Sequence, residues 1–183
     1  MTLQHDDTSA QSGTTARAED GTASVEASRS KESLRLWLRL LPVTTVIENQ
    51  LRTRLREHFD ITLAQFDVLS ELEHAGAPQT MSELSRRLLV SGGHVTGVVD
   101  RLERDGHVAR QPLENDRRVQ LVALTEQGKR TFLTVAERHE AWLEELLADM
   151  PLEEIRTLNQ LLARTKAAVR GVVERRAGRS PSE

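Results

Sequence analysis

The chain has 183 residues, of which 38% are hydrophobic and only 3% aromatic, and it carries a net charge of −3 and no cysteine. This length supports one domain of ordinary size, and the lack of cysteine excludes disulfides, thiolate metal sites and thiol-based redox sensing. No apolar run approaches the roughly 20 residues that span a bilayer, and the N-terminus lacks the pattern of a secretory signal. We therefore expect a cytoplasmic protein.

The negative charge is concentrated at the N-terminus. Residues 1–30 hold five acids and two arginines, whereas the charges of the rest of the chain balance. This segment is rich in Ser, Thr, Ala and Gly and has hardly any large apolar side chain, so we expect a disordered polar tail over residues 1–30. The nearly neutral net charge of residues 31–183 is compatible with DNA binding, but it argues against a non-specific coating protein, which would be much more basic.

An apolar pattern with helical spacing predicts a scaffold helix over about 33–59. The apolar residues of this pattern are Leu34, Leu38, Leu41, Ile47, Leu51, Leu55 and Phe59. Pro42 interrupts the pattern, because proline removes one backbone hydrogen bond and clashes with the preceding turn. Either the helix kinks at Pro42 or a new helix starts near it.

Two capping boxes predict the next two helices. In each, a threonine can cap the first turn while a Gln or Glu three residues later bonds back to the threonine backbone. Thr62 with Gln65 opens the first of these helices, and Thr80 with Glu83 opens a short second one that ends at Leu88.

A further helix opens at Ser91, whose hydroxyl can cap its first N–H groups, and it runs to Asp105. Gly106 is a favourable left-handed stop for it. The first turn is almost bare of bulk, which allows close approach to phosphates and base edges. Two short helices joined by a tight turn form a helix-turn-helix, and the second has the properties of a recognition helix.

Two strands rich in β-branched and aliphatic residues are predicted over 107–112 and 119–124, and they form a hairpin. The tip of this hairpin carries Asn115, Asp116, Arg117 and Arg118. An arginine at such a tip can enter a narrow minor groove, and a neighbouring carboxylate restrains its rotamers. Alone, a tip of this kind is usually a solvated turn, but beside a recognition helix it predicts DNA contact.

The end of the chain predicts two more apolar-striped helices, one capped by Thr125 and one following Pro151. A winged helix needs little of them for its own core. We therefore predict a mainly α protein with a small β-hairpin, in which a domain over 31–174 contains a DNA-binding lobe at about 62–125. Dimerisation helices at about 33–59 and 126–174 flank this winged helix-turn-helix, and residues 175–183 form a basic tail.

The segment GHVTGVVDRLERDGHVARQPLENDRRVQLVALTEQGK, residues 93–129, carries the Asp-x-Arg wing pattern followed by a strand and a Leu-Thr helix start. Here the chain resembles the MarR family of bacterial transcriptional regulators, over about Ser33 to Val173. The resemblance implies that Arg118 enters the minor groove and that Asp116 orients it. The DNA-contacting positions that it implies are Ser91, Gly92, Gly93, His94, Thr96, Gly97, Arg101, Asp116, Arg117 and Arg118. Because the twin glycines leave few side chains for base reading, we expect specificity to depend on the wing and on DNA shape.

The resemblance also implies a pocket for a small aromatic or anionic effector. The residues proposed for it are Arg35, Trp37, Arg39, Phe66 and Asp67. Trp37 offers a stacking surface, and the two arginines can anchor an anion. In the alternative interpretation, Trp37 packs at a dimer interface, Phe66 fills the core and the charged residues are solvated or paired.

We predict a homodimeric repressor that binds a pseudo-palindromic double-stranded DNA operator and is released by the effector, without cofactor or metal. The alternative is a winged-helix module for protein contact that lacks sequence-specific DNA binding. An enzyme is disfavoured, because the chain has no Gly-rich phosphate loop, nucleophile elbow or metal triad. Its six histidines also lack a metal-binding spacing on one helix face.

Overall fold

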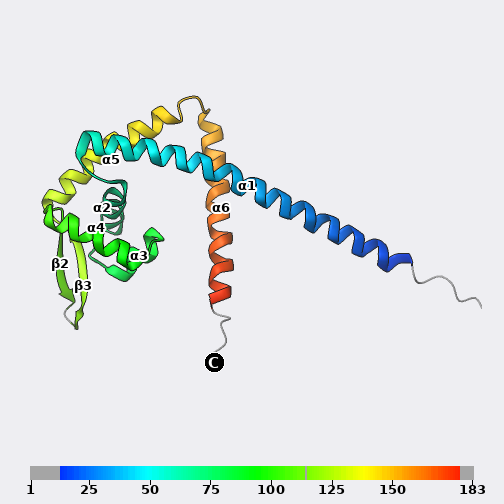
Figure 1. The fold of residues 1–183 in the computed structure, drawn as a ribbon, viewed down its shortest axis with the longest axis horizontal. Coiled ribbons are helices and arrows are strands. Elements are labelled where there is room, and N and C mark those ends of the chain that lie inside the picture. The colour runs from blue at the N-terminus through cyan, green and yellow to red at the C-terminus, as the bar shows by residue number, and fades with distance from the viewer. Residues whose placement is uncertain (1–12, 114, 178–183) are drawn as a thin grey trace, which may run out of the picture. The chain divides into compact units, whose positions relative to one another are not determined.

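The computed structural model describes residues 13–113 and 115–177, which form mainly helices with one small antiparallel sheet (Figure 1), as the sequence predicts. Internal packing divides the chain into two units, Met1–Gln50 and Leu51–Glu183. In chain order the elements are α1 (Gly13–Phe59), α2 (Leu63–Ala75), β1 (Gln79–Thr80), α3 (Met81–Leu88), α4 (Gly92–Arg104), β2 (Val108–Leu113), β3 (Asp116–Leu124), α5 (Glu126–Leu146) and α6 (Leu152–Ala177).

The first helix is longer than the sequence pattern indicates. α1 begins at Gly13, so the prediction of a disordered tail is wrong for residues 13–30, while residues 1–12 lie outside the described residues. The segment contains several Ala, Glu and Arg residues, which are strong helix formers. Once a helix exists in the apolar part of α1, extending it into such a segment avoids the cost of a new nucleus.

α1 also continues through Pro42, so the alternative in which a new helix starts there is wrong. The turn that follows the proline is supported by side chains. The hydroxyl of Thr44 donates to the Leu40 carbonyl oxygen at 3.1 Å, and that of Thr45 donates to the Leu41 carbonyl oxygen at 2.8 Å. Such bonds from a threonine to the preceding turn are compatible with helical backbone geometry.

Both predicted capping boxes are confirmed. The Gln65 N–H donates to the Thr62 hydroxyl at 3.2 Å, while the Gln65 side-chain oxygen accepts the Thr62 N–H at 3.0 Å. Glu83 and Thr80 form the same pair of bonds at 3.2 and 2.8 Å. The bond from the Thr80 backbone N–H to the Glu83 carboxylate favours the charged form and holds the pKa of Glu83 below its ordinary value. The start of α3 is therefore fixed locally.

The sheet contains a strand that the sequence pattern did not reveal. Its order is β1-β3-β2, and the two residues of β1 pair with Val122 and Leu121. The hairpin is confirmed, but β3 begins at Asp116 and not at residue 119. A register shift between Pro112 and Leu113 brings Leu113 opposite Asp116. The tip is thus an irregular extension of the hairpin, typical of a bulged strand.

The core of the second unit lies where α2, α3 and α4 meet the sheet. Its buried residues are Val68, Leu69, Leu72, Leu84, Val95, Val99, Leu102, Val108 and Val122. Three of them, Val95, Val99 and Leu102, lie on α4 at the spacing of one helix face. This stripe orients α4, because burying one face leaves the opposite face to solvent.

Trp142 of α5 anchors the last turns of α1. It is 5% exposed, and the rings of His58 and Phe59 lie 5.5 and 6.1 Å from it. The Arg54 guanidinium donates to both carboxylate oxygens of Glu145, at 2.8 and 2.9 Å, and lies 6.0 Å from the Trp142 ring. These hydrogen bonds hold the pKa of Glu145 below its ordinary value. Aromatic packing and a bidentate ion pair together fix α5 against the end of α1.

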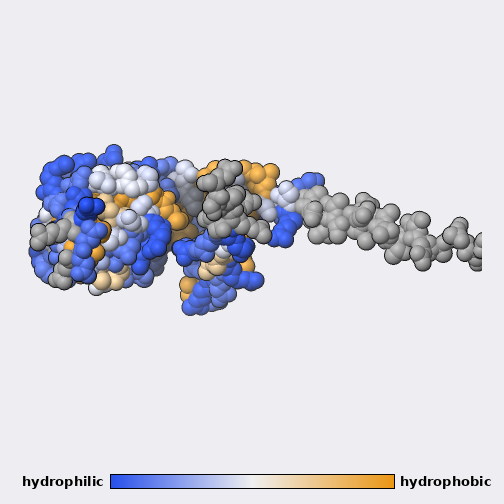
Figure 2. Space-filling model, turned by 90° about the horizontal axis from the view of Figure 1, so that it is seen from below, coloured by the Kyte–Doolittle hydropathy of each residue, from blue (hydrophilic) through white to orange (hydrophobic). Residues whose placement is uncertain are grey.

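α6 follows Pro151 as predicted and continues to Ala177, so residues 175–177 of the predicted basic tail are helical. Residues 178–183 lie outside the described residues. Exposed apolar side chains of the described residues include two groups, on α1 and on α6, and exposed leucines and valines are orange in Figure 2. These are Leu34, Leu36, Trp37, Leu38, Leu41, Val43, Val46, Leu152, Leu158, Leu161, Leu162, Val169, Val172 and Val173. Among the described residues, no helix has the length and apolarity required to cross a membrane.

Candidate nucleic-acid interface

The exposed face of α4 carries the residues predicted to contact DNA. Val95, Val99 and Leu102 are buried, whereas the predicted contact positions on and before α4 are all exposed. These positions are Ser91, Gly92, Gly93, His94, Thr96, Gly97 and Arg101. An added Cβ would meet nothing within 4 Å at any of the three glycines. The glycines therefore do not serve packing inside the protein, and they leave this face open.

Ser91 caps α4 as predicted. Its backbone is extended and its hydroxyl accepts the His94 N–H at 3.4 Å. The hydroxyl of Thr96 donates to the Gly92 carbonyl oxygen at 2.9 Å. The Ser91 hydroxyl caps the start of the helix, and the macrodipole makes this end favourable for a phosphate.

The predicted wing tip is held by Asp116. Its Oδ1 accepts the backbone N–H of Arg118 at 3.0 Å, and both residues are exposed. The bond runs to the main chain, so what Asp116 restrains is the backbone of the strand at Arg118. Arg117 lies in β3, and its side chain lies outside the described residues.

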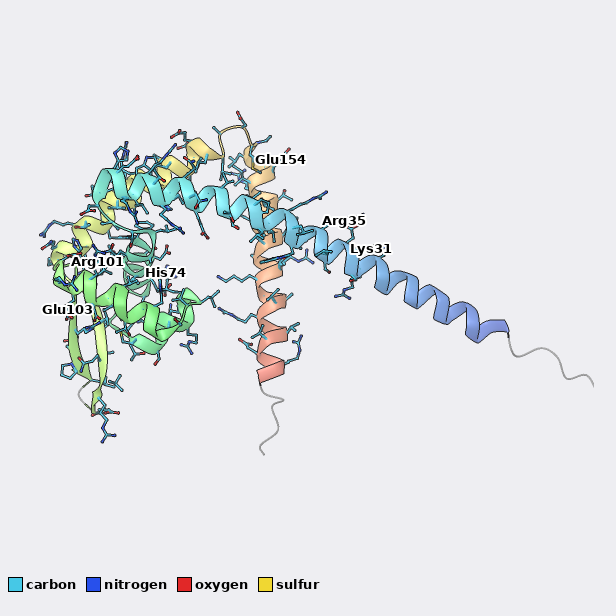
Figure 3. All side chains as sticks on the ribbon, viewed as in Figure 1. Lys31, Arg35, His74, Arg101, Glu103 and Glu154 are labelled. Atoms are coloured by element: carbon cyan, nitrogen blue, oxygen red, sulfur yellow. The ribbon has the colours of Figure 1, made fainter. Side chains whose placement is uncertain are left out.

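An ion cluster joins the wing to α4, and sequence reasoning missed it. The Arg110 guanidinium donates to Asp100 at 2.5 Å and to Glu103 at 3.1 Å, and Figure 3 shows Glu103 on α4 beside the hairpin. The spacing of the two acids places them on one side of a helix, which is a visible signal. Their partner was not visible, because it depends on how the hairpin folds back on α4.

An open groove of about 540 Å³ separates α3 from the start of α4. It is lined by Met81, Ser82, Ser85, Arg86, Leu89, Val90, Gly92 and Thr96. Leu89 ends α3 in the left-handed conformation at φ 57°, and Ser85 ties the turn by donating to the Val90 carbonyl oxygen at 2.6 Å. Gly92 and Thr96, which line this groove, also belong to the open face of α4.

A second cavity of about 50 Å³ brings together two residues that were predicted for different roles. Asp67, proposed for the effector, and His94, proposed for DNA, both line it, between α2 and α4. The rest of the lining is mostly apolar. Sequence reasoning did not predict this proximity, because α2 and α4 are separated by β1 and α3.

The other predicted effector residues lie in different surroundings. Arg35, Trp37 and Arg39 lie in the first unit and are exposed, Trp37 by 57%, and Arg35 is paired with Glu32. Figure 3 shows Arg35 on α1. Phe66 is 7% exposed and belongs to the core, as the alternative interpretation expected.

Phe66 stacks on His139 of α5, with ring centroids 4.5 Å apart, and on Phe132 at 5.9 Å. Burial lowers the pKa of His139, so the neutral imidazole is the favoured form at neutral pH. This stack attaches α2 to α5.

α3 and α4 form a helix-turn-helix, in which α4 is capped and has an open face. Together with the hairpin that carries an arginine at its tip, they define a winged-helix DNA-binding protein. A sequence profile of the MarR family matches residues 59–119. The transcriptional activatory protein BadR of Rhodopseudomonas palustris is 36% identical over 132 residues, which make up 70% of this chain and 75% of BadR. The chain belongs to the MarR family of transcriptional regulators, and the related proteins are regulators and not enzymes.

Solved structures agree with this assignment. A mutant of MarR from E. coli in complex with operator DNA matches with a TM-score of 0.66 at 32% identity, over 73% of this chain and 95% of that chain. AbsC from Streptomyces coelicolor matches with a TM-score of 0.66 at 28% identity, over 74% and 93% of the two chains. The chain is therefore a DNA-binding transcriptional regulator with the MarR winged-helix fold.

Proposed function

We propose that this protein is a cytoplasmic homodimeric repressor that binds a pseudo-palindromic operator and is released by a small aromatic or anionic effector. The observation that carries the proposal is the open face of α4, where Gly92, Gly93 and Gly97 have nothing within 4 Å of an added Cβ. A helix whose exposed face carries glycines in place of larger side chains can lie close to another large surface. The deep major groove of DNA is such a surface.

In this proposal α4 enters the major groove and the hairpin lies along the neighbouring minor groove. His94 and Arg101 are the α4 side chains that reach base edges or phosphates, and Arg118 enters the minor groove. Ser91, Thr96, Asp116 and Arg117 complete the contact surface. Because two of these positions carry hydroxyls that already bond within the helix, sequence reading depends largely on groove width and DNA deformability.

The exposed apolar residues of α1 and α6 support a dimer. Leu36 and Val46 of α1 are 47% and 59% exposed, and Leu161 and Val173 of α6 are 52% and 60% exposed. A second copy that covers such residues gains the free energy of apolar burial. With two-fold symmetry, two α4 helices about 34 to 36 Å apart would meet successive major grooves.

The effector is proposed to act on this spacing. Trp37 can stack on an aromatic ring, while Arg35 or Arg39 of the same unit can bind its polar groups. Phe66 is enclosed in the core and is better suited to transmit a shift of α2 than to touch the effector. A coupling of about 1 to 3 kcal/mol would weaken operator binding roughly 5- to 150-fold.

Activation is a second candidate for the direction of regulation. BadR, which is 36% identical to this chain, carries the name of a transcriptional activatory protein. The DNA-binding surface is compatible with either outcome, because the position of the operator relative to the promoter decides whether polymerase is blocked or recruited. A reporter gene placed behind the native upstream region, with and without the regulator, distinguishes the two.

The deciding experiment is a titration of the purified protein into duplex DNA from its own upstream region and into a scrambled duplex, at two salt concentrations. We expect a preference of about 10³-fold for the native duplex at physiological salt, with affinity falling as salt rises. Equal, weak binding to both duplexes would favour a winged-helix module that contacts proteins.

A further inference from the structure

Arg110 of β2 ties the wing hairpin to the recognition helix through two acids. Its guanidinium donates to Asp100 at 2.5 Å and to Glu103 at 3.1 Å. The two acids are three positions apart on α4, so they lie on one side of the helix about one turn apart. Because the guanidinium is planar and rigid, two such bonds restrain direction as well as distance.

Glu103 makes a further bond to the same strand. Its Oε1 accepts the backbone N–H of Arg110 at 3.3 Å. β2 is an edge strand, since the strand order is β1-β3-β2, and an outward N–H of an edge strand has no ladder partner. Glu103 supplies that partner. The side chain and the main chain of Arg110 are therefore both bound to α4.

The Arg110 side chain is more buried than the two acids that it binds, and this raises the importance of the bonds for its position. The Arg110 side chain is 23% exposed, whereas Asp100 and Glu103 are 46% and 39% exposed. A cation that is mostly withdrawn from water depends on its partners for stabilisation, while the carboxylates remain partly hydrated. We therefore expect Arg110 to hold this position persistently, unlike an arginine in a fully exposed ion pair.

The position of Arg110 in the hairpin gives a small rotation a large effect. Leu113 at the tip is three residues further, or about 10 Å along the strand, so a tilt of about 10° at Arg110 moves the tip by roughly 2 Å. A hydrogen bond tolerates only about 0.5 Å of variation in length. A wing that tilts freely by this amount would lose its register with the minor groove.

We propose that Arg110 is a positioning residue for DNA recognition: through Asp100 and Glu103 it sets the angle between α4 and the wing, so that α4 and Arg118 reach adjacent grooves together. The inference rests on the proposed function for its DNA readout alone, because the restraint exists in the free protein.

A second role for Arg110 must be separated from positioning. Asp100 is exposed and lies four positions after Thr96, on the face that is proposed to meet DNA. Arg110 therefore also neutralises a carboxylate that would repel phosphates. Charge neutralisation predicts that removing all three charges restores binding, whereas positioning predicts that it does not.

The first test uses the free protein. Amide hydrogen exchange is measured for wild type, Arg110→Gln and the matched control Arg87→Gln, which also removes one positive charge and one ion pair between elements, to Glu71 at 2.8 Å. We expect exchange in 108–124 to rise about fivefold or more in Arg110→Gln, relative to wild type, and to stay unchanged there in the control. Thermal melting verifies that each variant is folded.

The second test measures DNA binding. Arg110→Gln should bind the upstream duplex roughly tenfold more weakly, and hydroxyl-radical footprinting should lose protection in the minor groove flanking the half-site. Methylation protection of the major groove under α4 should remain at saturating protein. Arg110→Lys should lie between the two, since one ammonium cannot bond both acids in a fixed geometry.

The triple variant Asp100→Asn, Glu103→Gln, Arg110→Gln gives the decisive comparison. Under positioning it stays as weak as Arg110→Gln. Recovery of wild-type affinity by the triple variant, or unchanged hairpin exchange in Arg110→Gln, would overturn the proposal. If the wild type shows no preference for its upstream duplex, the proposed function fails, and the exchange experiment still decides whether Arg110 restrains the wing.

Discussion

Arg118 is the residue on which the wing contact depends most directly. It is exposed, and Asp116 fixes its backbone through the bond of 3.0 Å to its N–H. A preorganised backbone reduces the entropy lost when the guanidinium binds. We expect Arg118→Ala to weaken operator binding by at least about 1 kcal/mol and to leave the oligomeric state unchanged.

Fluorescence anisotropy with labelled operator measures this loss, and size-exclusion chromatography follows the oligomeric state. Arg156→Ala is the matched control, because it removes an exposed arginine from α6 that is paired with Glu153. An affinity for Arg118→Ala equal to that of the control would remove the wing tip from the mechanism.

Gly128 shows how one residue can fix the junction between the sheet and α5. A Cβ at this position would lie 1.9 Å from the backbone oxygen of His107, a distance that only movement of the main chain can relieve. The same oxygen accepts the Thr125 N–H at 3.0 Å, at the cap of α5. The close approach is therefore part of how α5 starts.

Gly128→Ala should lower the free energy of unfolding by at least about 2 kcal/mol, because overpacking against backbone cannot relax by a rotamer change. Urea unfolding followed by circular dichroism measures it. Gly171→Ala on α6 is the control: its Cβ would meet only the flexible end of Arg175 at 3.1 Å. There we expect stabilisation of about 0.5 to 1 kcal/mol from helix propensity. Equal stability of the two variants would contradict the packing argument.

At the scale of elements, α4 separates packing from function on its two faces. Gly93 is exposed, with nothing within 4 Å of an added Cβ, so a larger side chain costs no internal contact. Gly93→Leu should keep or raise thermal stability, since leucine is the better helix former by up to about 1 kcal/mol. It should nevertheless block entry into the major groove by its bulk.

The measurement pairs a thermal melt with an operator titration. Gly93→Ala serves as the graded control, because it adds one methyl group and the same kind of helix stabilisation. If Gly93→Leu binds the operator like wild type, α4 is not the recognition helix. A loss of binding together with a loss of stability would also contradict the open-face argument.

The elements also show what the sequence can and cannot reveal. The starts of α2, α3, α4 and α5 were predicted correctly, because each cap is encoded within four residues, such as Thr80 to Glu83. β1 was missed because two residues carry no detectable period, and it forms only by pairing with Leu121 and Val122 of β3. The length of α1 was underestimated, because composition favours disorder until the cost of helix nucleation has been met further along.

The predicted site shows the same difference between features that are encoded locally and features that depend on contacts between elements. The open face of α4 could be predicted because its first turn is almost bare of bulky side chains, which the sequence shows directly. The Arg110 cluster could not, because its partners belong to another element and their contact is decided by the fold of the hairpin. Asp67 and His94 were assigned separate roles, and only the packing of α2 on α4 brings them to one cavity.

At the scale of the whole molecule, the proposed mechanism requires two copies. The apolar stripe of α6 includes Leu158 and Leu162, which are 43% and 36% exposed. Leu158→Lys combined with Leu162→Lys places two charges in this stripe, and burying them unpaired in a dimer interface would be costly. We expect this variant to be monomeric by light scattering, while circular dichroism shows that its helices remain.

Loss of the dimer should weaken operator binding far more than any single contact does. In a dimer, the second half-site is bound by an α4 that is already held nearby, which raises avidity by about 10² to 10⁴-fold over one lobe alone. The monomeric variant should lose this factor on the full operator and bind an isolated half-site like wild type. Gln160→Lys adds a charge to the same helix outside the stripe and should change neither property. A monomer that binds the full operator with wild-type affinity would show that each lobe acts alone, and the effector would then have to act within a single lobe.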